Sequence, residues 1–140
     1  SLSTIEMLAL KKFLNDRNIF FDLVDLKTIK PLNLSNVEKS LKKTKKLLVL
    51  DSISHPVCSI GSEIISQICR NKNIKLSKKP ILLTLPDVPA PTSVFYTKDF
   101  YIKKIDIIQK IEILIEKKIN FNFKEKNLHD VPDSKFKGPF

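Results

Sequence analysis

Apolar residues follow two different periods along this chain. Where they recur every three or four positions, the pattern predicts amphipathic helices, whereas short unbroken apolar runs predict buried strands. The predicted helices cover residues 4–15, 35–43, 61–69 and 105–118, and the predicted strands cover residues 20–25, 46–51 and 79–85. Helices and strands therefore alternate, as in an α/β protein.

Signals at the ends of these segments support the assignment. Ser3 with Glu6, and Ser35 with Glu38, have the spacing of a capping box, in which side chains satisfy free amides at a helix start. Gly61 opens the third helix, which requires either a left-handed residue or a close backbone contact. The prolines after the third strand exclude regular structure up to residue 95.

The alternating order predicts a three-layer α/β/α sandwich with a mainly parallel sheet, because parallel neighbours need a helical crossover. Three strands make a narrow sheet for this number of helices, and the chain opens on a helix. We therefore expect a further strand before Ser1. The predicted domain covers residues 1–118, and residues 119–140, which lack periodicity, are predicted to form an extended tail.

Charge raises the question of a nucleic-acid partner, because 25 Lys and Arg against 15 Asp and Glu give a formal net charge of +10. Only Arg17 and Arg70 are arginines, and the lysines are spread along every segment. This distribution favours solvated lysines that keep the protein dissolved over a nucleic-acid site. No apolar run is long enough to cross a membrane, and no secretory signal is present, so we predict a cytoplasmic or organelle-matrix location without membrane contact.

Few residues suggest chemistry. Gly61 and Gly138 are the only glycines, which excludes a glycine-rich phosphate loop, and no Ser-His-Asp or paired-His pattern occurs. His55, in a loop after a strand, is either a ligand-facing group or a polar loop residue. Cys58 precedes a helix start, where a thiol pKa can fall, whereas Cys69 lies on an apolar stripe and is predicted to be inert packing. Neither cysteine has the spacing of a metal site.

Four segments in order resemble one known family. Residues 25–32 (DLKTIKPL), 47–51 (LLVLD), 60–64 (IGSEI) and 86–91 (PDVPAP) are similar to motifs of the transketolase C-terminal domain family, especially of beta subunits of pyruvate and branched-chain 2-oxo acid dehydrogenases. The resemblance covers residues 3–115. Lys27, Asn33, Ser52 and Ser59 differ from the residues usual in that family, which is the pattern of a divergent paralogue.

The resemblance implies a domain that assembles an enzyme without performing its chemistry. The complete enzyme would decarboxylate a 2-oxo acid oxidatively with thiamine diphosphate and magnesium, which other domains hold, so no catalytic, cofactor or metal residue is expected here. The implied partners are an alpha subunit, a second beta subunit and the acyltransferase core. The alternative is a basic module that binds acidic proteins or nucleic acid.

Interface candidates come from the same motifs. A rigid, proline-rich loop loses little entropy on docking, and a carboxylate within it can fix the register of the partner. The candidates are Lys27, Pro31, His55, Gly61, Glu63, Asp87, Pro89 and Pro91.

Overall fold

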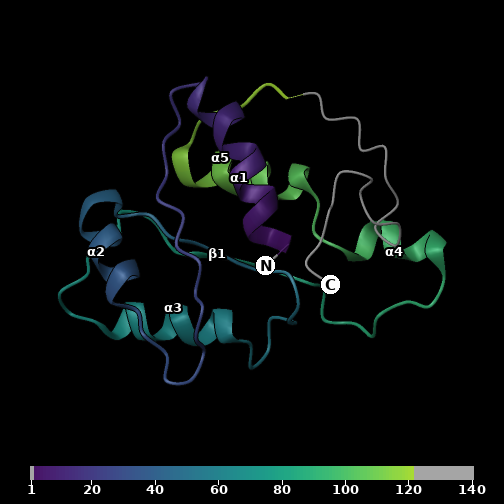
Figure 1. Ribbon diagram of the computed structural model, residues 1–140, viewed down its shortest axis with the longest axis horizontal. Coiled ribbons are helices and arrows are strands. Elements are labelled where there is room, and N and C mark those ends of the chain that lie inside the picture. Colours follow the sequence, from purple (N-terminus) through teal and green to yellow (C-terminus); the bar gives the residue numbers. More distant parts are fainter. Residues whose placement is uncertain (1, 122–140) are drawn as a thin grey trace.

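A computed structural model describes residues 2–121 of the chain. Its elements are α1 (Leu2–Asn15), α2 (Ser35–Thr44), β1 (Leu48–Asp51), α3 (Ile60–Arg70), β2 (Ile81–Thr84), α4 (Val94–Phe100) and α5 (Lys104–Ile115). The two strands lie in the middle of the molecule, with α3 on one side and α1 and α5 on the other (Figure 1). The predicted three-layer α/β/α architecture with a parallel sheet is confirmed.

The sheet of the described region consists of β1 and β2, which pair in parallel with Leu48 opposite Ile81 and Asp51 opposite Thr84. Successive side chains of a strand point to opposite faces. Leu48 and Leu50 accordingly pack on one side of the sheet, and Val49 packs on the other. This two-sided burial explains why both strands appear in the sequence as unbroken apolar runs.

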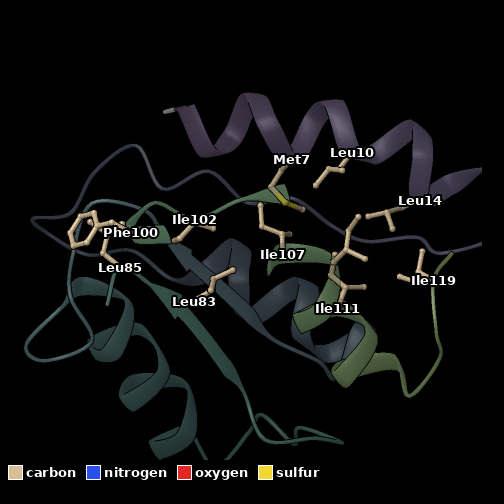
Figure 2. Packing of buried hydrophobic residues seen from close by; sticks show 11 residues of the cluster. Met7, Leu10, Leu14, Leu83, Leu85, Phe100, Ile102, Ile107, Ile111 and Ile119 are labelled. Atoms are coloured by element: carbon tan, nitrogen blue, oxygen red, sulfur yellow. The ribbon is translucent and has the colours of Figure 1, made fainter. Parts of the chain in front are cut away.

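The larger core lies between the sheet and the pair α1 and α5. Figure 2 shows side chains of α1 pointing toward those of α5, with β2 beneath them. Leu14, Ile107 and Ile108 are fully buried there. The three- and four-residue spacing of apolar positions in both helices thus produces one continuous apolar layer.

The second core fills the opposite side of the sheet, between β1, α2 and α3. Val37 and Leu41 of α2 meet Ile64 and Ile68 of α3, and Leu47 completes the cluster just before β1. The helical spacing within each pair places its two side chains on one face. Both layers of helices are therefore anchored to the sheet by residues that the apolar pattern identifies.

The predicted strand over residues 20–25 is wrong, because this segment has no regular secondary structure. Its side chains are nevertheless partly buried on both sides of the segment. Phe21 and Leu23 pack on the larger core, whereas Val24 and Leu26 pack on the second core. A strand also needs a hydrogen-bonded neighbour, and β1 and β2 pair only with each other in the part of the chain that the structure describes.

The predicted capping box of Ser35 and Glu38 is also wrong, whereas the side chain of Ser3, on which the other predicted box depends, lies outside the described ones. Helix α1 already begins at Leu2, so Ser3 lies inside it. At α2 the cap position is Leu34, and the amide of Ser35 donates to Asn33 Oδ1 at 3.0 Å. The Glu38 carboxylate accepts instead from Asn71 Nδ2 at 2.9 Å, which ties α2 to the end of α3.

The sequence pattern missed α4, a helix of 7 residues whose start is capped by Ser93, which accepts from the amide of Phe95 at 3.3 Å. Beyond α5, Ile119 is buried in the larger core and Phe121 packs against it, so the first residues of the predicted tail contact the domain. Residues 122–140 lie outside the described region. The division into a domain and a tail stays a prediction.

Candidate functional site

The loops that follow β1 and β2 meet at the carboxyl end of the sheet, next to α4 (Figure 1). His55 Nδ1 lies 2.6 Å from the carbonyl oxygen of Pro86, and the amide of Leu85 donates to the carbonyl of Ser54 at 3.1 Å. Because a carbonyl only accepts, Nδ1 carries the proton. We call this region, residues 52–59 and 85–93 with the first turn of α4, the carboxyl-end face.

Asp51 organises the first of these loops from the last position of β1. Its Oδ1 accepts from the amides of Ser54 at 3.2 Å and Ile53 at 3.5 Å, and its Oδ2 accepts from the amide of Gly61 at 3.3 Å. A carboxylate that accepts several amides holds a loop in one conformation. The sequence placed Asp51 at the carboxyl end of a strand but did not identify it as a site residue.

Gly61 lies within the first turn of α3, where the helix is closest to the sheet. A Cβ at this position would lie 2.5 Å from Leu82 Cδ1 and 3.3 Å from Val49 Cγ1. Close packing of helix against sheet is therefore the reason for this glycine. Ser59 caps the same helix by accepting from the amide of Ser62 at 3.0 Å.

Five large apolar side chains are exposed on the carboxyl-end face. They are Ile53, Val57, Val88, Phe95 and Tyr96, of which Ile53 is 81% exposed and Phe95 72%. Other exposed apolar side chains are distributed over α1, α5 and residues 20–29. Isolated exposed apolar residues are ordinary on protein surfaces, whereas several on loops fixed to one another are typical of a contact surface. The apolar residues of α4 were missed because α4 itself was.

The predicted interface residues divide into two groups. His55, Gly61, Asp87, Pro89 and Pro91 belong to the carboxyl-end face or its base, and Asp87 and Pro89 are exposed.

The other three candidates lie elsewhere. The exposed Lys27 Nζ is 3.3 Å from Asp25 Oδ2, and Pro31, after a cis peptide bond, lies in the turn before α2. Glu63 is directed along α3, where it contacts Gln67 and Arg70. An interface role for any of the eight residues stays a prediction.

Both cysteines are exposed. The prediction that Cys69 is buried packing is therefore wrong, because the buried stripe of α3 runs through Ile64 and Ile68 and leaves the next residue at its edge. Cys58 has a φ of 55° in the loop before α3. No redox role follows from exposure alone.

Two observations concern the binding of a diphosphate and a magnesium ion. The chain's two glycines lie at positions 61 and 138, so no glycine-rich loop can form. In the described residues, no three His, Cys, Asp or Glu side chains are grouped to hold a metal ion. That the cofactor is held by other domains of a complete enzyme stays a prediction. Within residues 2–121 no helix is long and apolar enough to cross a membrane.

Comparison with known proteins gives a consistent picture. Residues 3–107 match the family described as "Transketolase, C-terminal domain". Over 98 residues the chain is 29% identical to the pyruvate dehydrogenase E1 component subunit beta of Mesostigma viride, covering 70% of this chain and 30% of that protein. It is 31% identical over 110 residues to the acetoin:2,6-dichlorophenolindophenol oxidoreductase subunit beta of Bacillus subtilis (strain 168), covering 76% of this chain and 31% of the relative. The chain thus spans about 30% of the length of these relatives.

Proposed function

We propose that this chain, which belongs to the transketolase C-terminal domain family, is the assembly domain of a thiamine-diphosphate-dependent 2-oxo acid dehydrogenase beta subunit. Its carboxyl-end face would contact a second beta subunit. The alpha subunit and the acyltransferase core would be the further partners. Thiamine diphosphate and magnesium would be held by other parts of the enzyme, so the chain by itself should show no saturable cofactor binding by calorimetry.

The observation that carries this proposal is the set of exposed apolar side chains on loops that are already fixed in place. The bonds from His55 to Pro86 and from Leu85 to Ser54 join the two loops, and Asp51 holds the first of them. A prearranged surface pays little conformational entropy when a partner binds. Apolar side chains at its centre then contribute through burial.

Charge favours a second copy of the domain as the occupant. The loops at residues 52–59 and 85–93 contain no lysine or arginine, and Asp87 is their only carboxylate. Two strongly basic chains can therefore approach through these loops without placing their lysines against one another.

Sedimentation velocity of the full 140-residue chain tests the proposal. We expect wild type to self-associate at concentrations up to roughly 100 μM, the range in which a modest apolar interface is populated. Val88→Lys should shift the distribution toward monomer, because it places a charge in the apolar centre. Asp87→Lys should weaken association as well, since it brings a lysine from each copy into loops that otherwise contain no cation.

Ile113→Lys is the matched control, because Ile113 is similarly exposed but lies on α5, away from the carboxyl-end face. It should sediment like wild type. A monomeric wild type over the whole range, or equal effects of Val88→Lys and Ile113→Lys, would rule out this surface as the interface.

A further inference from the structure

The lysines that the sequence spreads along the chain are gathered by the fold at the opposite end of the sheet. Residues 42–47 lead into β1 and residues 70–80 lead into β2, and together they contain nine lysines and arginines and no carboxylate. Ser77 joins the two segments, since its amide and hydroxyl donate to the carbonyl of Lys45 at 2.8 and 3.0 Å. We call these two segments the lysine face.

Three carboxylates pair with cations of the lysine face: Asp22 with Lys43, Glu63 with Arg70, and Glu116, at the end of α5, with Lys78. Glu116 is the one that both segments influence. Its pKa is lowered by a hydrogen bond from Lys78 and by the charge of Lys78, with a further contribution from Lys46. Both segments of the lysine face therefore reach the same carboxylate. Lys117 and Lys118, which follow directly, are exposed and extend the basic surface.

Local structure explains only part of this concentration of charge. Helices α2, α3 and α5 all end at this side, and a helix C-terminus carries about half a negative charge, so three of them supply roughly −1.5. Glu116 adds one more negative charge. Within residues 2–121, ion pairs hold Lys43, Arg70 and Lys78, which leaves six of the nine cations without a paired carboxylate there, so the face presents a positive potential.

A hollow of about 390 Å³ with a mixed lining lies within the lysine face. Ile68, Ile74, Leu76 and Pro80 supply its apolar lining, and Cys69, Ser77, Lys78 and Lys79 supply the rest. Apolar surface surrounded by cations complements a ligand that carries apolar side chains between carboxylates.

We propose that the lysine face binds an acidic protein segment whose carboxylates pair with the lysines and whose apolar side chains enter the hollow. This interaction is separate from subunit association through the carboxyl-end face and does not depend on it. Net charge alone left acidic proteins and nucleic acid open as partners, and the proposal assigns this surface to acidic proteins.

The composition of the face favours an acidic protein over nucleic acid. Residues 42–47 and 70–80 contain no aromatic side chain on which a base could stack. Arg70 is their only arginine, the residue that forms bidentate contacts with phosphate and guanine. Ile74, Leu76 and Pro80 contribute apolar lining to the hollow, and a phosphate backbone has no apolar group to place against them.

Fluorescence anisotropy with the full chain tests this proposal. The probe is a labelled peptide of about 15 residues, roughly four helical turns, that repeats Glu-Glu-Leu-Glu. We expect it to bind, and to bind several-fold more weakly when every leucine is replaced by serine. The variant Lys75→Glu with Lys79→Glu should lower its affinity about tenfold or more, and Glu116→Gln should raise it about twofold.

The matched control is Lys30→Glu with Lys104→Glu, which makes the same change in net charge. Lys30 precedes the start of α2 and Lys104 opens α5, whereas both helices reach the lysine face with their other ends. This control should lower the affinity for the peptide less than threefold. Circular dichroism should show that all variants are folded.

Two results would overturn the proposal. One is equal loss of peptide affinity in both double variants, which would show a response to net charge and not to this face. The other is tighter binding of single- or double-stranded DNA of about 20 nucleotides per strand than of the peptide at the same salt concentration, which would assign the face to nucleic acid.

Discussion

The two ends of the sheet differ in nearly every property that governs contact with a partner. The carboxyl-end face carries exposed apolar side chains, one loop carboxylate and no loop cation, and it is held by Asp51 and by the contact between His55 and Pro86. The lysine face carries nine cations and a hollow lined by both apolar and polar side chains. The comparison suggests that one domain can bind a second copy of itself through one surface and an acidic partner through the other.

Parallel topology makes this separation possible. Because β1 and β2 run in the same direction, every loop that leaves a strand lies at one end and every loop that enters a strand lies at the other. The ends of α2, α3 and α5 coincide with the entering loops, so their dipoles favour cations there. Lysines in those loops are thus tolerated by the fold as well as available to a ligand.

The largest effect is expected from Gly61→Val. A valine would meet Leu82, Val49 and the Cβ of Asp51, and this overpacking should lower the free energy of unfolding by about 3 kcal/mol. Urea denaturation followed by circular dichroism measures the change. Gly61→Ala should cost less, because the nearest atom, Leu82 Cδ1, is the end of a side chain that can rotate. Equal stability of valine variant and wild type would contradict the packing explanation.

A smaller loss is expected from Asp51→Ala, which removes the acceptor for the amides of Ile53, Ser54 and Gly61. Partly buried amides without an acceptor should cost about 2 kcal/mol in unfolding free energy. Hydrogen exchange should show faster exchange in residues 52–59 and unchanged exchange in residues 70–80. Asp51→Asn keeps one oxygen acceptor, so it should lower the free energy of unfolding by less than Asp51→Ala does. Faster exchange at both ends of the sheet would mean that the two faces are not independent.

The smallest change in unfolding free energy is expected at Lys45, where a substitution should stabilise the fold. Lys45 caps α2 with a φ of 54°, a left-handed conformation that costs most side chains energy and glycine very little. Lys45→Gly should therefore raise the free energy of unfolding by about 0.5–1 kcal/mol while weakening the acidic peptide through the loss of one charge. Lys46 is an exposed neighbour without the left-handed conformation, and Lys46→Gly removes the same charge. It should therefore weaken binding of the acidic peptide without raising the free energy of unfolding. The pair separates the contribution of a lysine to folding from its contribution to binding.

Much of the architecture was predictable because burial on both sides of a parallel strand leaves a clear record in the sequence. Residues 46–51 and 79–85 contain β1 and β2, and the helical spacing located α3 and α5 closely. Residues 20–25 were wrongly predicted as a strand because a short apolar run indicates burial and not hydrogen-bonded pairing, and this segment packs its side chains without pairing to a strand. Helix α4 was missed because seven residues after a proline-rich loop carry too little periodicity.

Sequence alone determined the family, the sandwich of helices around a parallel sheet, and the irregular backbone of residues 86–91, since these depend on local spacing and on residue types that restrict the backbone. Only the tertiary structure decided which charges and apolar groups share a surface. Lys45 and Ser77 are 32 positions apart yet joined by hydrogen bonds, as are His55 and Pro86 at 31. Proximity of this kind results from strand pairing and helix packing. The positions of lysines along the chain do not reveal it.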